Sequence, residues 1–167
     1  MSGGRWRAMT VADLAAVEAI ADAVHVAFPE DAAIPRERLA LFPAGCRIAE
    51  DDAGTVGYCV AHPWRLGRVP PLDTLLGAIP ADADCLYIHD VAILPRGRGD
   101  GLGSTLCPML VDVARAHRLA TLALTAVSGS APFWRRNGFS AVVSDALATK
   151  LRSYGEGAIY MTRPVDP

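Results

Sequence analysis

The sequence has little of what marks nucleic-acid-binding or membrane proteins. Its 167 residues contain no long basic stretch and carry a formal net charge of −2, so general nucleic-acid binding is not expected. No apolar run approaches the roughly 18 uninterrupted residues of a transmembrane helix. Residues 1–10 also lack the apolar segment of a secretory signal peptide. We therefore predict a cytoplasmic protein with neither a nucleic-acid nor a membrane partner.

The cysteines lack the spacing of a metal site or a redox motif. Cys46, Cys59, Cys85 and Cys107 form no CxxC pair, and none has a histidine at metal-ligand spacing. No metal is therefore predicted, and the thiols are expected to be reduced and half-buried, as in cytosolic proteins. Neither Cys85 nor Cys107 has an obvious activating base, which argues against a covalent cysteine intermediate.

Apolar residues, in contrast, are plentiful. They make up 51% of the chain, which at this length is enough to build one hydrophobic core. We predict that residues 1–167 form a single α/β domain with a central mixed sheet. The predicted strands are 5–9, 46–50, 55–61, 86–93, 121–127, 139–143 and 158–162. The predicted helices lie between Thr10 and Pro29 and over 35–41, 102–117 and 131–136, with one more helical turn at 72–76 inside a long excursion, 64–84.

Closely spaced glycines join the strand at 86–93 to the next helix. The segment 98–104 reads Arg-Gly-Asp-Gly-Leu-Gly-Ser. Backbone N–H groups at a helix start have no intrahelical partner and favour an anion, and glycines let phosphates approach the backbone closely. Arg98 adds a permanent positive charge and Ser104 a hydroxyl. The pattern predicts a phosphate-binding turn.

Other phosphate-binding motifs fit this turn less well. A Walker A motif would end in Gly-Lys-Ser/Thr, which is absent. The dinucleotide motif GxGxxG fails because Ser104 stands where its last glycine would be. The remaining alternative is a tight strand-to-helix turn without any ligand.

Two segments in this order resemble the GNAT N-acetyltransferase superfamily. Arg98 with Gly101 and Gly103 is similar to its Arg/Gln-x-x-Gly-x-Gly motif, and a second register begins at Arg96. Residues 131–139, Ala-Pro-Phe-Trp-Arg-Arg-Asn-Gly-Phe, resemble the family's Phe/Leu-Tyr-x-x-x-Gly-Phe stretch. The resemblance implies acetyl-CoA as acyl donor and a sheet whose fourth and fifth strands splay apart to admit it. The cofactor-binding residues it implies are Val91, Ile93, Arg98, Gly99, Asp100, Gly101, Gly103, Ser104, Phe133 and Trp134.

Trp134 departs from the family pattern. It stands where many members carry a tyrosine that is assigned as the acid for the departing CoA thiolate. An indole N–H donates a hydrogen bond but cannot deliver a proton near neutral pH. Either another group protonates the thiolate, or the thiolate leaves unassisted.

Candidate acid–base residues lie on the strand at 86–93. Strict alternation places Tyr87, His89 and Val91 on one face and Ile88, Asp90 and Ala92 on the other. The predicted catalytic residues are His89, Asp90 and Tyr87. His89 is favoured as the general base, and Asp90 either is the base instead, orients a histidine or lies beneath the sheet. The N–H of Val91 is expected to polarise the thioester carbonyl. The other histidines, His25, His62 and His117, are expected on the surface.

The resemblance favours an N-acetyltransferase whose acceptor amine attacks acetyl-CoA directly. The acceptor is an amine of a small molecule or a protein, and the excursion 64–84 with the N-terminal helices is expected to wall its pocket. Glu30, Asp31 and Asp73 are expected to be solvated surface acids, although they could attract a cationic amine. The alternatives are an acyl-CoA-binding module with little catalysis and a protein for a different nucleotide. The sequence leaves open whether two copies pair as a homodimer.

Overall fold

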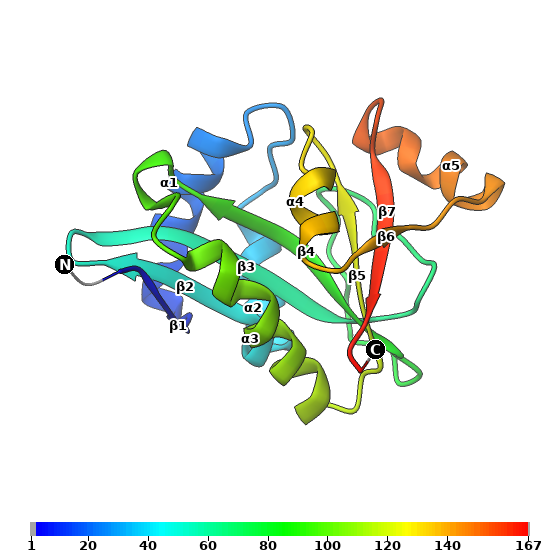
Figure 1. The fold of residues 1–167 in the computed structure, drawn as a ribbon, viewed down its shortest axis with the longest axis horizontal. Coiled ribbons are helices and arrows are strands. Elements are labelled where there is room, and N and C mark those ends of the chain that lie inside the picture. The colour runs from blue at the N-terminus through cyan, green and yellow to red at the C-terminus, as the bar shows by residue number, and fades with distance from the viewer. Residues whose placement is uncertain (1–2, 167) are drawn as a thin grey trace.

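A seven-stranded mixed sheet forms the centre of the molecule (Figure 1). The structure is a computed structural model that describes residues 3–166. The strands are β1 (Arg5–Ala8), β2 (Cys46–Asp51), β3 (Gly54–Trp64), β4 (Cys85–Ile93), β5 (Thr121–Ala126), β6 (Ser140–Ala141) and β7 (Ile159–Pro164). They lie in the order β1-β2-β3-β4-β5-β7-β6, and β4 and β5 run parallel whereas the other neighbouring pairs are antiparallel. The predicted α/β fold is confirmed.

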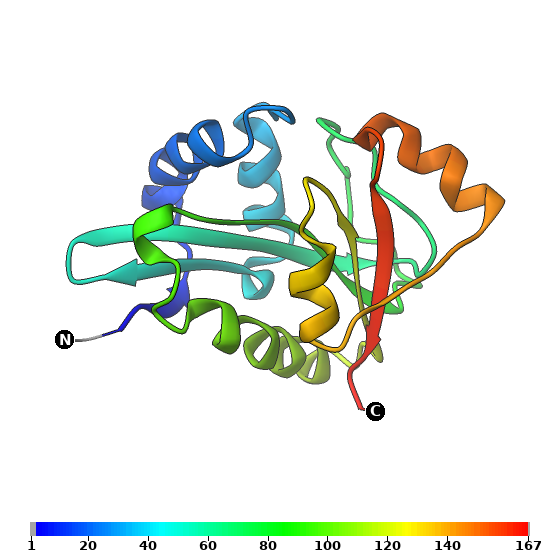
Figure 2. The same ribbon diagram turned by 45° about the horizontal axis from the view of Figure 1, so that its top comes forward.

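Helices cover both faces of this sheet (Figure 2). On one face lie α1 (Leu14–Val24), α2 (Ala33–Leu41) and α5 (Asp145–Leu151), and on the other lie α3 (Leu102–Ala116) and α4 (Ala131–Arg136). The helices pack apolar side chains against the sheet, and α3 buries a stripe at helical spacing that includes Leu106, Leu110 and Val113. Within residues 3–166, no helix is long and apolar enough to cross a membrane.

The sheet opens between its fourth and fifth strands, as predicted. β4 pairs with β5 only from Cys85 to Ile88, opposite residues 121–124. β4 then continues to Ile93 without pairing to β5. The β5-facing edge of β4 beyond Ile88 therefore has no strand partner, which leaves backbone groups available to a ligand.

A bulge at His89 overturns the predicted alternation along β4. Val60 of β3 pairs with Asp90 and the next residue, Ala61, pairs with Ile88, so His89 has no residue opposite it. Ile88 packs in the core cluster beneath α3, whereas Asp90 is paired with Val60 on the α1 face. The expectation that Ile88 and Asp90 share one face is wrong because one extra residue inverts the side-chain order.

Other elements differ from their predicted bounds. α1 ends at Val24 rather than at Pro29, so 25–32 form a loop that returns toward β4. The excursion contains no helical turn at 72–76. The predicted strand 139–143 is reduced to β6, and the helix α5 was not predicted at all. The four cysteines are fully rather than half buried and are unpaired.

His62 is buried rather than exposed. Its Nδ1 lies 3.0 Å from the carbonyl oxygen of Pro63, and its Nε2 has no hydrogen-bond partner. Burial lowers the pKa of His62 to about 3. The unfolded chain, whose histidine pKa is roughly 6.5, therefore binds a proton at mildly acid pH that the folded protein does not bind.

This difference predicts a loss of stability on acidification. Neutral, buried His62 contributes its full share to the free energy of unfolding above about pH 6.5, the pKa of histidine in the unfolded chain. This share is lost as the pH falls from about 6.5 toward 3. Between pH 7 and pH 5 the loss is about 2 kcal/mol. The free energy of unfolding, measured with urea at pH 7 and pH 5, should show this loss in the wild type and not in His62→Gln. Equal losses in both proteins would contradict this assignment.

Candidate active site

The separation of β4 from β5 creates a groove with a cavity of about 580 Å³. One wall is β4 from Ile88 to Ile93, and the other includes Thr125 of β5 and the aromatic residues of α4. The glycine-rich turn closes one end. His25, the residue after α1, also lines the groove. The groove thus joins the predicted phosphate-binding turn to the predicted acid–base residues.

The turn before α3 is built by two left-handed glycines. Gly99 has a φ of +89° and Gly101 a φ of +81°, a region that other residues rarely adopt. Gly101 is the N-cap of α3, and no side chain caps this helix. The hydroxyls of Ser104 and Thr105 donate to the carbonyl of Gly101 at 2.9 and 3.1 Å. The side chains thus shape the turn, while the N–H groups of the first helical turn have no side-chain cap and can face an anion.

The two arginines beside the turn have different environments. Arg98 lines the groove, and its Nε donates to the carbonyl of Ile93 at 3.1 Å. Arg96 instead points to the β2–β3 hairpin, where its Nη1 lies 2.7 and 2.9 Å from the carboxylate oxygens of Asp51. This placement favours the motif register that begins at Arg98.

Replacing each arginine tests that register. Arg98→Ala removes one charge-assisted contact, typically about 1.5–3 kcal/mol, so acetyl-CoA affinity should fall roughly ten- to hundredfold. Arg96→Ala is the matched control and should change the affinity little. Titration calorimetry measures both. A large loss in Arg96→Ala with a mild effect in Arg98→Ala would reverse the assignment.

The aromatic residues of α4 face both the groove and the core. Trp134 is 7% exposed and packs edge-to-face against Phe133 and Phe139. A Cβ added at Gly103 would lie 3.2 Å from the Phe133 ring, so this glycine lets α3 approach α4 closely. Phe133 and Trp134 both line the groove, where they are suited to contact an alkyl chain.

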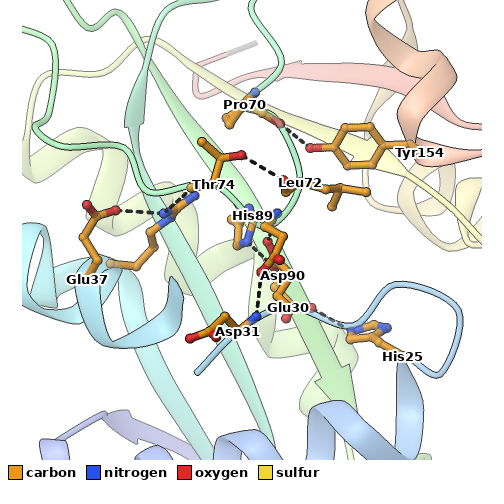
Figure 3. Close-up of polar contacts among 12 residues, drawn as sticks. His25, Glu30, Asp31, Glu37, Pro70, Leu72, Thr74, His89, Asp90 and Tyr154 are labelled. Atoms are coloured by element: carbon orange, nitrogen blue, oxygen red, sulfur yellow. Dashed lines mark hydrogen bonds and ion pairs between the residues drawn. The ribbon is translucent and has the colours of Figure 1, made fainter. Parts of the chain in front are cut away.

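At the bulge, His89 is paired with a carboxylate from the loop after α1 (Figure 3). Its Nε2 lies 2.7 Å from Oε1 of Glu30. The other oxygen of Glu30 accepts the N–H of Asp73 at 2.9 Å. Burial opposes ionisation of Glu30, but the hydrogen bond and charge of His89 lower the pKa of this carboxyl below its usual value. The pair can hold or accept a proton.

A second carboxylate–histidine pair lies on the α1 side of the bulge. Oδ1 of Asp90 is 2.7 Å from Nε2 of His25, and its Oδ2 accepts the hydroxyl of Tyr58 at 2.5 Å. The interaction with Asp90 raises the pKa of His25, against the opposing effect of burial. His25 is therefore half-buried and charge-paired rather than a surface residue, whereas His117 is exposed as expected.

Not all the predicted site residues lie in the groove. Tyr87 is 2% exposed, bonds through its hydroxyl to Thr125 at 2.8 Å, and does not line the cavity. Burial raises the pKa of Tyr87 well above its usual value, so the geometry gives no support to an acid–base role. Asp100, Gly101 and Ser104 belong to the turn and also lie outside the cavity lining.

The excursion after β3 is fastened beside the His89–Glu30 pair (Figure 3). Glu37 of α2 accepts the N–H groups of Leu76 and Gly77 at 2.7 and 3.0 Å. Oδ1 of Asp73 accepts the N–H of Asp31 at 2.6 Å. Glu30 is half-buried and is therefore not the solvated surface acid that was expected, whereas Asp31 and Asp73 are exposed as expected, although both also take part in hydrogen bonds between these loops.

Sequence reasoning missed three residues of this region, namely His25, Glu30 and Tyr58. The sequence predicted that the first helix continues to Pro29, which would have placed His25 and the following turn on a helix surface. Tyr58 lies on β3 and meets Asp90 only through the sheet register. No motif in the sequence marks these residues.

The family model of the acetyltransferase (GNAT) family matches residues 15–139. No curated protein sequence matches the chain. Ard1 from Thermoplasma volcanium has a TM-score of 0.74 at 17% identity, over 99% of both chains. A chain of a NatC complex bound to Gag peptide and CoA has a TM-score of 0.73 at 19% sequence identity, and the match covers 98% of this chain and 99% of that chain. The GNAT-like decarboxylase GphF, in complex with isobutyryl-CoA, has a TM-score of 0.74 at 16% sequence identity, and the match covers 96% of this chain and 99% of that chain.

Proposed function

We propose that this chain, which belongs to the acetyltransferase (GNAT) family, transfers the acetyl group of acetyl-CoA to an amine. The observation that carries the proposal is the groove itself. It has an uncapped helix start and Arg98 at one end, and two histidine–carboxylate pairs at the other. One end suits a multiply charged pyrophosphate, and the other suits proton transfer.

The free edge of β4 supports the placement of the rest of the donor. Beyond Ile88 this edge has no partner strand, and Val91 and Ile93 line the groove. A pantetheine arm lying along this edge would bring its thioester near the bulge. The N–H of Val91 would then polarise the thioester carbonyl, as a preorganised donor does for developing negative charge.

His89 is proposed as the general base. It lines the groove and also a small second cavity beside α1, so it separates the donor side from the loop 25–32. Oε1 of Glu30 lies 2.7 Å from Nε2 of His89 and fixes the orientation of the ring. In this position the imidazole would take the proton that the amine loses as its nitrogen attacks the thioester.

Direct attack is favoured over a covalent cysteine intermediate. All four cysteines are buried, and burial raises the pKa of Cys107 to about 11 and of Cys46 and Cys85 to about 12. Thiolate is the reactive form of cysteine. None of these groups is therefore suited to accept the acetyl group.

The acceptor is proposed to be an amine of a small molecule or a protein, bound beside the loop 25–32, where His89 lines both the groove and the small cavity next to α1. The second candidate is an acyl-CoA-binding module with little catalysis, which Trp134 favours because it replaces an ionisable donor. The fold is also compatible with other chemistry on acyl-CoA, since GphF is a GNAT-like decarboxylase.

Binding and turnover together test the proposal. Acetyl-CoA should raise the melting temperature because it binds the folded state, and ATP or NAD should not. Thiol release is then followed with spermidine, tyramine, glutamate and a short peptide with a free N-terminus. Stabilisation by acetyl-CoA with no thiol release from any amine would favour the binding module. Stabilisation by ATP or NAD alone would contradict both candidates.

A further inference from the structure

The groove contains no tyrosine suited to protonate the departing thiolate. Trp134 carries an indole, which cannot deliver a proton near neutral pH. Tyr87 does not line the groove, and its hydroxyl is bonded to Thr125, which does, whereas the hydroxyl of Tyr58 donates to Asp90. An acid for the leaving group must come from elsewhere in the groove or be absent.

His25 is placed to meet this need. It is the first residue after α1, where the helix ends and its ring can turn toward β4. It lines the groove together with Asp90 and Val91, next to the bulge. Its side chain is 25% exposed, and its Nε2 lies 2.7 Å from Oδ1 of Asp90. The ring is thus held by a carboxylate through Nε2, which is itself buried, and the rest of the ring is the part that is exposed at the groove.

We infer that His25 is the general acid of the proposed acetyl transfer, held by Asp90 and charged while the donor is bound. The inference rests on the proposed function. It assigns the two pairs different tasks, with His89–Glu30 accepting a proton from the amine and His25–Asp90 supplying one to sulfur.

The protons balance over one cycle. The amine nitrogen attacks the thioester carbon, and the nitrogen's extra proton passes to His89. The carbon–sulfur bond then breaks, and its electron pair stays on sulfur, which takes a proton from the imidazolium of His25. The products are the N-acetylated amine and the CoA thiol. Exchange of one proton with water at each histidine restores both groups.

The charges around His25 favour its protonated form. Among the residues that the structure describes, those that share the small cavity of about 40 Å³ with His25 carry four carboxylates and no lysine or arginine, whereas Arg98 shares only the larger groove with it. The titratable groups of the small cavity are Glu18 and Asp22 of α1, Glu30 of the loop, Tyr58 of β3, and His89 and Asp90 of β4. The raised pKa of His25 agrees with this environment. A group in this state can act as an acid at neutral pH and loses that ability as the pH rises.

The pH profile of turnover tests the assignment. Hydroxylamine serves as the acceptor because it is largely uncharged across the neutral and alkaline range. Hydroxylamine also cleaves thioesters without a catalyst, so thiol release is counted only as the excess over a protein-free control at each pH. It is measured from about pH 6 to pH 10 in the wild type, His25→Gln and His117→Gln. His117 is exposed and contacts Phe42 at a ring distance of 4.7 Å, so it is the matched control.

The wild type and His117→Gln should show a kcat that falls on the alkaline side. His25→Gln should lose about a hundred- to ten-thousandfold in kcat at neutral pH, keep its acetyl-CoA affinity and melting temperature, and lose that alkaline fall. An unchanged rate and profile in His25→Gln would overturn this inference while leaving the proposed function intact. A wild type that binds acetyl-CoA but releases no thiol at any pH would overturn the proposed function and this inference with it.

Discussion

Gly101→Val is expected to abolish measurable acetyl-CoA binding while the protein stays folded. Gly101 is the N-cap of α3 at a φ of +81°, a conformation that a β-branched residue strongly disfavours. A Cβ there would meet only Ser104 Oγ at 3.8 Å, so the core is not disturbed. The strain instead acts on the backbone that aims the first N–H groups of α3. Titration calorimetry should show a loss of more than about a hundredfold, as expected when several charge-assisted contacts fail together.

Gly67→Val separates this effect from strain alone. Gly67 has a φ of +80°, and an added Cβ would meet nothing within 4 Å. It lies in the excursion after β3, away from the turn before α3. This variant should suffer similar backbone strain but keep its acetyl-CoA affinity. Normal binding by Gly101→Val would show that the pyrophosphate does not lie on this turn.

His89→Gln is expected to lower kcat by about a hundred- to ten-thousandfold, the usual contribution of a general base. The amide of glutamine can still donate to Glu30, so the loop 25–32 should keep its position. It cannot accept a proton near neutral pH. Acetyl-CoA affinity should therefore be unchanged, and the loss should appear in kcat rather than in donor binding.

Tyr87→Phe provides the contrast on the same strand. Its hydroxyl bonds to Thr125 at the wall of the groove, while Tyr87 itself is buried outside the groove, so removal of the hydroxyl should lower stability by about 1 kcal/mol and leave turnover near the wild-type rate. If Tyr87→Phe lost activity as severely as His89→Gln, the assignment of the base would fail. A His89→Gln variant with full activity would have the same consequence.

Local chemistry in the sequence was sufficient to predict the sheet and the glycine-rich turn. Alternating and helical apolar patterns fall on the observed strands and helices because each pattern has to bury one face. The segment 98–104 could be interpreted because glycines at a strand-to-helix junction have a direct effect on backbone geometry and anion binding. Residues on β4 were likewise located in the correct strand.

The pairing of each histidine with its carboxylate could not be predicted because it depends on contacts between distant segments. Glu30 meets His89 across 59 positions, and His25 meets Asp90 only because α1 ends at Val24. The bulge at His89 is set by pairing with β3, which alternation within one strand does not reveal. The burial of His62 likewise depends on tertiary contacts, since its ring packs against Trp64, Tyr87 and His89, and no periodic signal in the sequence marks it.

Tracing the acetyl group itself tests the central claim most directly. The protein is incubated with acetyl-CoA that carries a deuterated acetyl group and with the amine that releases the most thiol, and the products are analysed by mass spectrometry. We predict that the label appears on the amine nitrogen in amounts equal to the free CoA thiol. Label found only in free acetate, or retained on CoA despite saturating binding, would contradict the conclusion that this chain acetylates an amine.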